Sequence, residues 1–271
     1  MTAVAGPKLD LDSERLAREY EELSTTRQLE SGKNLLARLG IAPTERVLDV
    51  GCGTGLLAQH LADLVGPAGM VLGLDPLKHR IELAREKTRP NLSFDVGDAN
   101  DLSMLAQSSF DVVVLNAVFH WLPEKTGPLR QFARVLRRGG RLGISTGLKG
   151  YRAPLQEVMI AALREPPFDA YSPARESIIF LVDAVDMRAL LEASGFEPAR
   201  VEVVETEQRF PSAETALRFS DASSFGNVFA HLPAELRSQA RAHVLRRLGE
   251  VVGPGGLVQK VRRLIAIGSR C

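Results

Sequence analysis

The sequence has few cysteines, no long apolar run and almost no net charge, and each of these shortages excludes a class of protein. Its 271 residues contain two cysteines, Cys52 inside a glycine-rich stretch and Cys271 at the end. This pair rules out a disulfide framework and fits a reducing cytoplasm. No segment approaches about 18 uninterrupted apolar residues, and the beginning of the chain lacks an apolar signal core. We therefore expect neither secretion nor a membrane span.

The low net charge bears on partners. Lys and Arg number 34 against 33 Asp and Glu, which leaves a net charge of +1. No overall field then draws the protein to phosphate backbones or to anionic membranes, so we expect no nucleic-acid partner. Four late arginines have acidic residues nearby, and we interpret them as the solvated face of a helix: Arg237, Arg241, Arg246 and Arg247.

The composition that is present, 45% apolar and 25% charged, is typical of a globular domain. Short apolar runs alternate with helical spacing, and such alternation favours a parallel sheet covered on both faces. We predict a doubly wound α/β fold that follows two helices, one capped by Ser13 and one over Arg27–Leu39. The predicted strands are Arg46–Val50, Met70–Asp75, Leu92–Val96, Phe110–Asn116 and Gly140–Thr146. The helices between them are indicated by Leu57, Leu61 and Leu64, by Leu77, Ile81 and Ala84, and by Leu129, Phe132 and Leu136.

The alternation stops after Gly147. Prolines 154, 166, 167 and 173 interrupt a stretch that contains one helical run, Leu155–Arg164, and we interpret this stretch as a cap or lid. The rest completes the sheet, with one late strand expected to be antiparallel. Its predicted elements are a helix over Asp186–Ser194 that ends at Gly195, a strand over Arg200–Glu207, a long helix with Leu236, Ala240, Val244 and Leu248 on one face, and a strand over Val261–Gly268.

A glycine-rich turn, Asp49-Val50-Gly51-Cys52-Gly53-Thr54-Gly55, lies between the first strand and the following helix. Glycines there allow positive φ and close approach of a ligand, and the helix N-terminus offers unpaired N–H groups. A dinucleotide fingerprint would have its third glycine at position 56, where this chain has Leu56. Asp75 ends the second strand, where a carboxylate can accept both hydroxyls of a ribose. The pattern predicts a nucleoside ligand.

These residues resemble those of the class I S-adenosylmethionine-dependent methyltransferases, which have a Rossmann-like fold. The resemblance covers Arg46 to Thr146 and includes the DxGxGxG turn, Asp75, Gly97-Asp98-Ala99 after the third strand, Phe110-Asp111 and Leu136-Arg137-Arg138-Gly139-Gly140. It implies a mostly parallel seven-stranded sheet with one antiparallel strand. It further implies one domain, 1–271, made of N-terminal helices that form a lid (1–45), a cofactor-binding core (46–147), a cap (148–185) and a C-terminal part that completes the sheet and carries a helical insertion (186–271).

The resemblance also implies residue roles. Gly51, Gly53 and Gly55 would face the methionine moiety of S-adenosylmethionine, Asp75 the ribose, and Asp98 with the Ala99 N–H the adenine. Some of these residues have a plain structural alternative: Asp49 orders the turn or contacts the ammonium indirectly, Asp98 forms an Asx-turn, and Cys52 fills a small buried space. The expected cofactor-binding set is Asp49, Gly51, Cys52, Gly53, Gly55, Asp75, Pro76, Asp98, Ala99 and Asn116. Tyr20 and Arg27 are weaker candidates for closing over the cofactor.

The loop after the fourth strand, Asn116-Ala117-Val118-Phe119-His120-Trp121, is where the acceptor should meet the cofactor. His120 is the titratable group of that loop suited to neutral pH, so it is the candidate general base. Its structural alternative is a histidine that fixes the loop. We interpret Trp121 as a wall of the acceptor pocket.

Missing residues narrow the acceptor. The loop lacks the two prolines that the family pattern associates with amino-directed methylation of nucleic acids, two distant cysteines cannot supply the thiolates that arsenite needs, and Asn116 alone cannot hold a metal. We expect metal-free, in-line methyl transfer from S-adenosylmethionine, yielding S-adenosylhomocysteine, to oxygen, nitrogen or carbon of a small organic acceptor. The alternatives are an NAD-type oxidoreductase and a non-catalytic S-adenosylmethionine-binding regulatory subunit. Methylation of RNA or protein and a homo-oligomer also stay open.

Overall fold

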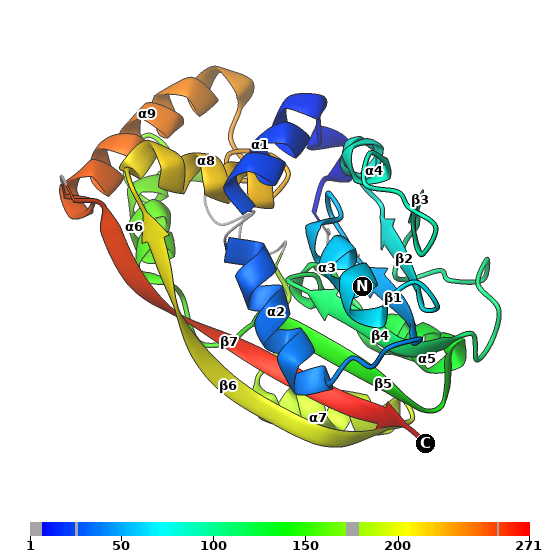
Figure 1. The fold of residues 1–271 in the computed structure, drawn as a ribbon. Coiled ribbons are helices and arrows are strands. Elements are labelled where there is room, and N and C mark those ends of the chain that lie inside the picture. The colour runs from blue at the N-terminus through cyan, green and yellow to red at the C-terminus, as the bar shows by residue number, and fades with distance from the viewer. Residues whose placement is uncertain (1–6, 25–26, 172–178, 254) are drawn as a thin grey trace.

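A computed structural model describes residues 7–24, 27–171, 179–253 and 255–271. These form a twisted seven-stranded sheet with helices on both faces (Figure 1), in the order β3-β2-β1-β4-β5-β7-β6. β7 runs antiparallel to both of its neighbours, and the other pairs are parallel. The strands are β1 Arg46–Val50, β2 Met70–Asp75, β3 Leu92–Val96, β4 Phe110–Asn116, β5 Leu136–Gly147, β6 Phe196–Phe210 and β7 Leu257–Arg270. This is the predicted fold class.

The central strands are apolar at successive positions because both faces of the sheet are covered. Val47 packs into one cluster with Leu35, while its neighbour Leu48 packs into another with Phe132. The first cluster lies under α2 (Arg27–Leu39), α3 (Leu56–Val65) and α4 (Lys78–Arg85), and the second lies under α5 (Thr126–Val135) and α7 (Ala184–Ala193). The two clusters fix the height and direction of the strand ends that carry the candidate site.

A third apolar cluster lies beyond the sheet and forms the cap. It joins the end of α1 (Glu14–Ser24) to α6 (Pro154–Leu163), α8 (Ala213–Ser223) and α9 (Ala234–Val251). Figure 1 shows α6, α8 and α9 grouped at the end of the long β6–β7 ribbon. The cap therefore draws on helices from well outside 148–185, and the helix α8 was missed by the sequence analysis. Ser212 caps α8 by accepting from the Thr215 N–H, which is the local signal that could have found it.

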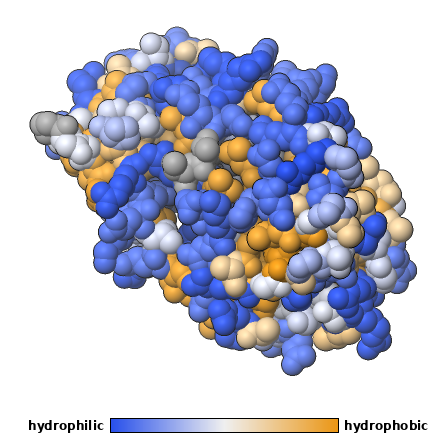
Figure 2. All heavy atoms as spheres, in the orientation of Figure 1, coloured by the Kyte–Doolittle hydropathy of each residue, from blue (hydrophilic) through white to orange (hydrophobic). Residues whose placement is uncertain are grey.

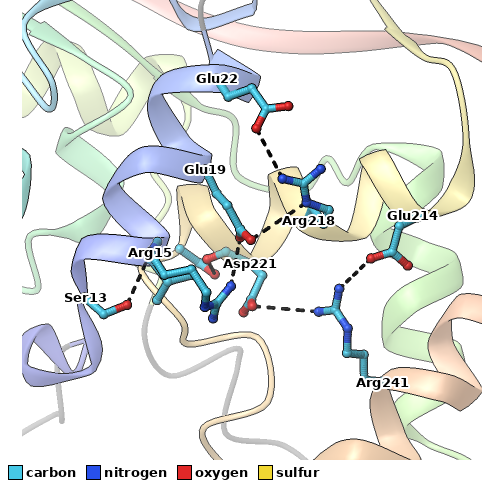
Figure 3. Close-up of polar contacts among 10 residues, drawn as sticks. Ser13, Arg15, Glu19, Glu22, Glu214, Arg218, Asp221 and Arg241 are labelled. Carbon is cyan, nitrogen blue, oxygen red and sulfur yellow. Dashed lines mark hydrogen bonds and ion pairs between the residues drawn. The ribbon is translucent and has the colours of Figure 1, made fainter.

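Ion pairs tie α1 to the cap across its outer surface (Figure 3). Arg218 of α8 lies 3.3 Å from Glu22 and 3.9 Å from Glu19. Arg241 of α9 lies 2.8 Å from Glu214 and 3.9 Å from Asp221. Exposed pairs such as these stabilise by about 1 kcal/mol or less each, so the apolar cluster beneath them dominates. The predicted solvated arginine face is thus partly engaged within the chain.

Several predicted boundaries differ from the observed ones. The first four strands have the predicted bounds, whereas the last three are longer than expected. β6 and β7 pair with each other out to Phe210 and Leu257, past the rest of the sheet, and β5 begins earlier, where Leu136 pairs with Phe110. Leu136 opens β5 instead of ending the preceding helix. The helix expected from Asp186 begins at Ala184, since the Asp183 carboxylate caps it.

Figure 2 shows the surface of one side of the molecule. Hydrophilic residues cover most of that face, and the apolar ones appear as separate patches. Within the described ranges, none of the helices combines the length and the apolar character needed to cross a bilayer.

Candidate active site

The glycine-rich turn connects β1 to α3 and has the backbone conformation that its glycines predict. Gly51, Gly53 and Gly55 have φ values of +72°, +57° and +86°, in the region that only glycine adopts without strain. Gly55 is the N-cap of α3, so the first N–H groups of that helix face the turn without helical partners. The turn therefore presents backbone donors and the positive end of a helix dipole.

Neighbouring side chains pack against this turn so closely that a Cβ would not fit at two of the glycines. A Cβ added at Gly51 would lie 2.2 Å from Val118 Cγ2, and one at Gly55 would lie 2.7 Å from the Phe94 ring. At Gly53 the nearest atom would be Tyr20 Cε1, at 3.0 Å. Tyr20 thus lies over the turn from α1, as expected for a side chain that closes the site.

Asp75 lies at the carboxyl end of β2, directly beside the turn. Its Oδ2 accepts from the Gly53 N–H and its Oδ1 from the Leu77 N–H, each at 2.9 Å. Burial raises the pKa of Asp75, and Arg80 opposes this rise. Backbone donors thus fix the orientation of the carboxylate, and the lone pairs that they leave remain for a polyol.

Asp49, at the start of the turn, has a buried carboxylate oxygen without a hydrogen-bond partner in the described part of the chain. This Oδ2 accepts no hydrogen bond from the described residues. The buried hydroxyl of Thr54 likewise has no hydrogen-bond partner there. Burial, with a smaller contribution from Asp75, raises the pKa of Asp49 to about 7. Both residues line a small cavity of about 30 Å³ that Tyr20 and Asn116 also border. An orphaned carboxyl beside a glycine cradle fits a ligand that brings a cationic group to this turn, as S-adenosylmethionine would.

The other residues predicted to bind the cofactor differ in burial and in their hydrogen-bond partners. Asn116 ties the end of β4 to α2 by donating to the Gln28 carbonyl at 2.9 Å. Asp98 is exposed and accepts from the Asn100 backbone and side chain, which is the Asx-turn alternative. Ala99 is buried beside it, Pro76 is exposed after β2, and Cys52 is buried under the turn, where burial raises the pKa of its thiol.

A much larger cavity, of about 400 Å³, opens between the carboxyl ends of β4 and β5 and the cap. The two cavities are neighbours: Gln28 lines both, and of the consecutive residues Asn116 and Ala117 the first borders the small cavity and the second the large one. The apolar walls of the large cavity are made by aromatic and aliphatic side chains: Trp121, Leu155, Ile160, Phe210, Phe219 and Val261. A volume of this size is typical of sites for small organic ligands.

His120 lies on the wall of the large cavity, as the loop prediction implied. Its Nδ1 is 3.1 Å from Thr146 Oγ1, and its ring packs on Trp121. Burial, reinforced by the positive charges of Arg263 and Lys125, lowers the pKa of His120 to about 3. The imidazole is therefore neutral at physiological pH, and its protonated form is strongly disfavoured.

The sequence analysis missed Arg80, a buried arginine that joins the core to the lid. It lies on α4, donates from Nη2 to the Ala222 carbonyl of the cap at 2.8 Å, and stacks 3.9 Å from the centre of the Tyr20 ring. Arg27, considered for the cofactor carboxylate, instead stacks on Phe210 and Phe219 and donates to the backbone carbonyls of Leu23 in α1 and Arg209 in β6. No local signal separates a buried arginine from a solvated one.

Comparison with known proteins agrees with this geometry. A family model described as a methyltransferase domain matches residues 41–165. Methyltransferase GfsG from Streptomyces halstedii is 32% identical over 191 residues, which are 68% of this chain and 64% of that protein. The malonyl-[acyl-carrier protein] O-methyltransferase from Methylococcus capsulatus is 29% identical over 232 residues, which are 83% of this chain and 78% of that protein.

The whole fold recurs among solved structures. A chain from the Haloferax volcanii complex between the Trm112 methyltransferase activator and a methyltransferase superposes with a TM-score of 0.60 at 21% identity, and 94% of each chain is covered. The chain spans 64% of the length of GfsG and between 36 and 50% of three further curated relatives. From the turn, the sheet order and these matches together, the chain belongs to the class I S-adenosylmethionine-dependent methyltransferases.

Proposed function

We propose that this chain transfers a methyl group from S-adenosylmethionine to a small organic acceptor bound in the large cavity, without a metal. The observation that carries the proposal is that the two cavities are neighbours, with Gln28 in the lining of both and Asn116 and Ala117 in the lining of one each. One cavity has the glycine cradle and the orphaned carboxyl that suit the cofactor, and the other has the volume and apolar walls that suit an acceptor. A cofactor bound in the first cavity would bring its methyl group to the side on which the acceptor lies.

The bound cofactor supplies an electrophilic methyl group on a sulfonium, and the protein supplies alignment and dryness. The turn holds one reactant through its backbone, and Asn116 keeps the end of β4 fixed against α2. An acceptor bound against Trp121 and the apolar walls would displace water from the large cavity. Among the described residues, no three His, Cys, Asp or Glu side chains gather as a set of metal ligands.

We assign His120 a positioning role in this reaction. A general base works best with a pKa near the working pH, and the pKa of His120 is about 3. Its ring instead anchors the loop after β4 through Thr146 and Trp121. This role favours an acceptor that has no proton to lose at the moment of transfer.

We further propose that α1 moves when the cofactor enters. The small cavity holds about 30 Å³, close to the space of one water molecule, and Tyr20 and Leu29 border it. We therefore assign the lid role to α1 and the start of α2, with Arg80 as the contact that closes it. The movement exposes the turn and Asp75 together.

The test is calorimetric titration of the chain with S-adenosylhomocysteine and, separately, with NADH, followed by transfer of labelled methyl groups to a panel of small acids, alcohols and amines. We expect S-adenosylhomocysteine to bind, NADH not to bind, and at least one acceptor class to take the label. Binding of NADH alone would replace the proposal with an oxidoreductase. Tight S-adenosylhomocysteine binding without transfer to any member of the panel would indicate a regulatory subunit.

A further inference from the structure

The charged side chains that line the large cavity are all of one sign. Among the described residues that line it there are three arginines, Arg152, Arg262 and Arg263, and no Asp or Glu. Other polar groups of the lining are already engaged: Gln259 donates to Gln208, and the hydroxyls of its serines donate to carbonyls of α8. The charged side chains of the lining are thus all positive, and these neutral polar groups already have partners.

The three arginines differ in their own partners. Arg152 lies 3.9 Å from Glu157 and Arg262 lies 3.4 Å from Glu205, and both are well exposed. Within the described part of the chain, Arg263 has no carboxylate within 4 Å, and its hydrogen-bond acceptor is the Gln28 Oε1 at a long 3.4 Å. Arg263 is also less exposed, and burial lowers its pKa. A guanidinium in such a place is stabilised only when an anion pairs with it.

The position of Arg263 places that anion next to the reaction. It lies opposite Gly147, the last residue of β5, and its acceptor Gln28 lines both cavities. Its charge is also felt by His120, on the loop where the acceptor should meet the cofactor. A planar guanidinium offers paired N–H donors that match the two oxygens of a carboxylate, as they also match those of a phosphate, and the single charge of a carboxylate balances that of one guanidinium.

We infer that the acceptor is a small organic carboxylate with an apolar body, that Arg263 binds its carboxylate, and that a carboxylate oxygen receives the methyl group. The inference rests on the proposed methyl transfer. The apolar body would lie against Trp121, Leu155 and Phe210, and the carboxylate beside Gln28.

The chemistry balances without any proton transfer. The bond between sulfur and the methyl carbon breaks and leaves its electron pair on sulfur, while a carboxylate lone pair forms the new carbon–oxygen bond. The positive sulfonium and the negative carboxylate become a neutral thioether and a neutral methyl ester. This agrees with a cavity in which the described lining offers no acid or amine, and whose histidine resists protonation.

The experiment uses octanoate and 3-phenylpropanoate as probes, each beside its primary amide and primary alcohol. With S-adenosylhomocysteine bound, calorimetry should show each acid binding at least about tenfold more tightly than its amide, the scale of one charge-assisted pair. With labelled S-adenosylmethionine, the acids should yield a base-labile methyl ester. Failure of S-adenosylhomocysteine to bind would instead defeat the proposed function itself.

Variants locate the effect. Arg263→Gln should lower kcat/KM for the acids at least about tenfold and change S-adenosylhomocysteine affinity less than about twofold, with Arg263→Lys in between. The matched control is Lys260→Gln on the same strand, since Lys260 is exposed, pairs with Glu205 and does not line the cavity. Retained S-adenosylhomocysteine binding reports that Arg263→Gln is folded. Equal binding of acid and amide, a base-stable methyl product, or an Arg263→Gln variant that handles acids like the wild type would each overturn the inference.

Discussion

The candidate site has two halves that lie side by side, the glycine turn after β1 and the large cavity beyond β5 and β7. They differ in whether backbone groups or side chains form them. The turn is backbone: glycines at positive φ, a helix N-terminus, and the two carboxyls of Asp49 and Asp75. The cavity is lined by side chains from α2, α6, α8 and the long β6–β7 ribbon, and the charged residues among them are arginines. The contrast shows why a shared cofactor can accompany variable acceptors: the cavity walls can change without altering the turn.

The strongest test of the backbone half is Gly51→Ala. The added Cβ would meet Val118 at 2.2 Å on a residue with φ +72°, so we expect a loss of about 2–4 kcal/mol in the free energy of unfolding. S-adenosylhomocysteine binding should be lost as well, measured by calorimetry. Gly139→Ala is the control, because that glycine has φ +71° and open space around it; strain alone should cost about 1 kcal/mol. Equal effects at both sites would mean that close packing of the turn is unimportant.

The acidic character of the same half predicts a pH dependence. The pKa of Asp49 is raised to about 7, against about 4 in an unfolded chain, so the folded state binds the extra proton between these values. The contribution of Asp49 to the stability of the unliganded protein should therefore fall as pH rises from about 4 to about 7 and then level off. Asp49→Asn removes this contribution, and denaturation at pH 5 and pH 8 should show a difference about 2 kcal/mol smaller than in the wild type. Parallel behaviour of the two proteins would contradict the raised pKa.

Arg80 tests whether the two halves are mechanically joined. Arg80→Met removes the hydrogen bond to Ala222 and the stacking on Tyr20, for an expected loss of about 1–2 kcal/mol in the free energy of unfolding. Hydrogen exchange in α1 should speed up, since its contact with the core is weakened. Arg85→Met on the same helix is the control, because Arg85 is exposed and pairs with Asp95 at the surface. Unchanged exchange in α1 would remove Arg80 from the lid.

The smallest expected effect belongs to His120. Gln in its place can still bond Thr146, so His120→Gln should keep turnover within about tenfold, and the pH–rate profile should show no change between pH 6 and 8 that depends on residue 120. Steady-state kinetics of wild type and variant at matched S-adenosylmethionine concentration measure this. A fall of a hundredfold or more, with loss of a titration step, would restore His120 as the general base.

The two halves also differed in how far the sequence could predict them. The first four strands were predicted with their observed bounds: β1 and β4 are nearly continuous buried apolar runs, and the edge strand β3 alternates apolar and exposed residues at its start. The C-terminal strands were predicted too short, since beyond the sheet they alternate polar and apolar residues and only mutual pairing shows their length. The helix α8 escaped because its apolar face is completed by α1, α6 and α9 rather than by its own sequence.

The sequence alone determined the fold class, the glycine turn and the position of Asp75, because these depend on backbone conformation and on neighbours close along the chain. Only the tertiary structure decided what faces the turn across space. Tyr20 and Arg80 come from different helices and pack together beside it. Arg263 comes from the last strand and lines the cavity, where no carboxylate of the described residues pairs with it. Burial and pairing of an arginine are properties of its surroundings in space, and one chain read in order does not contain them.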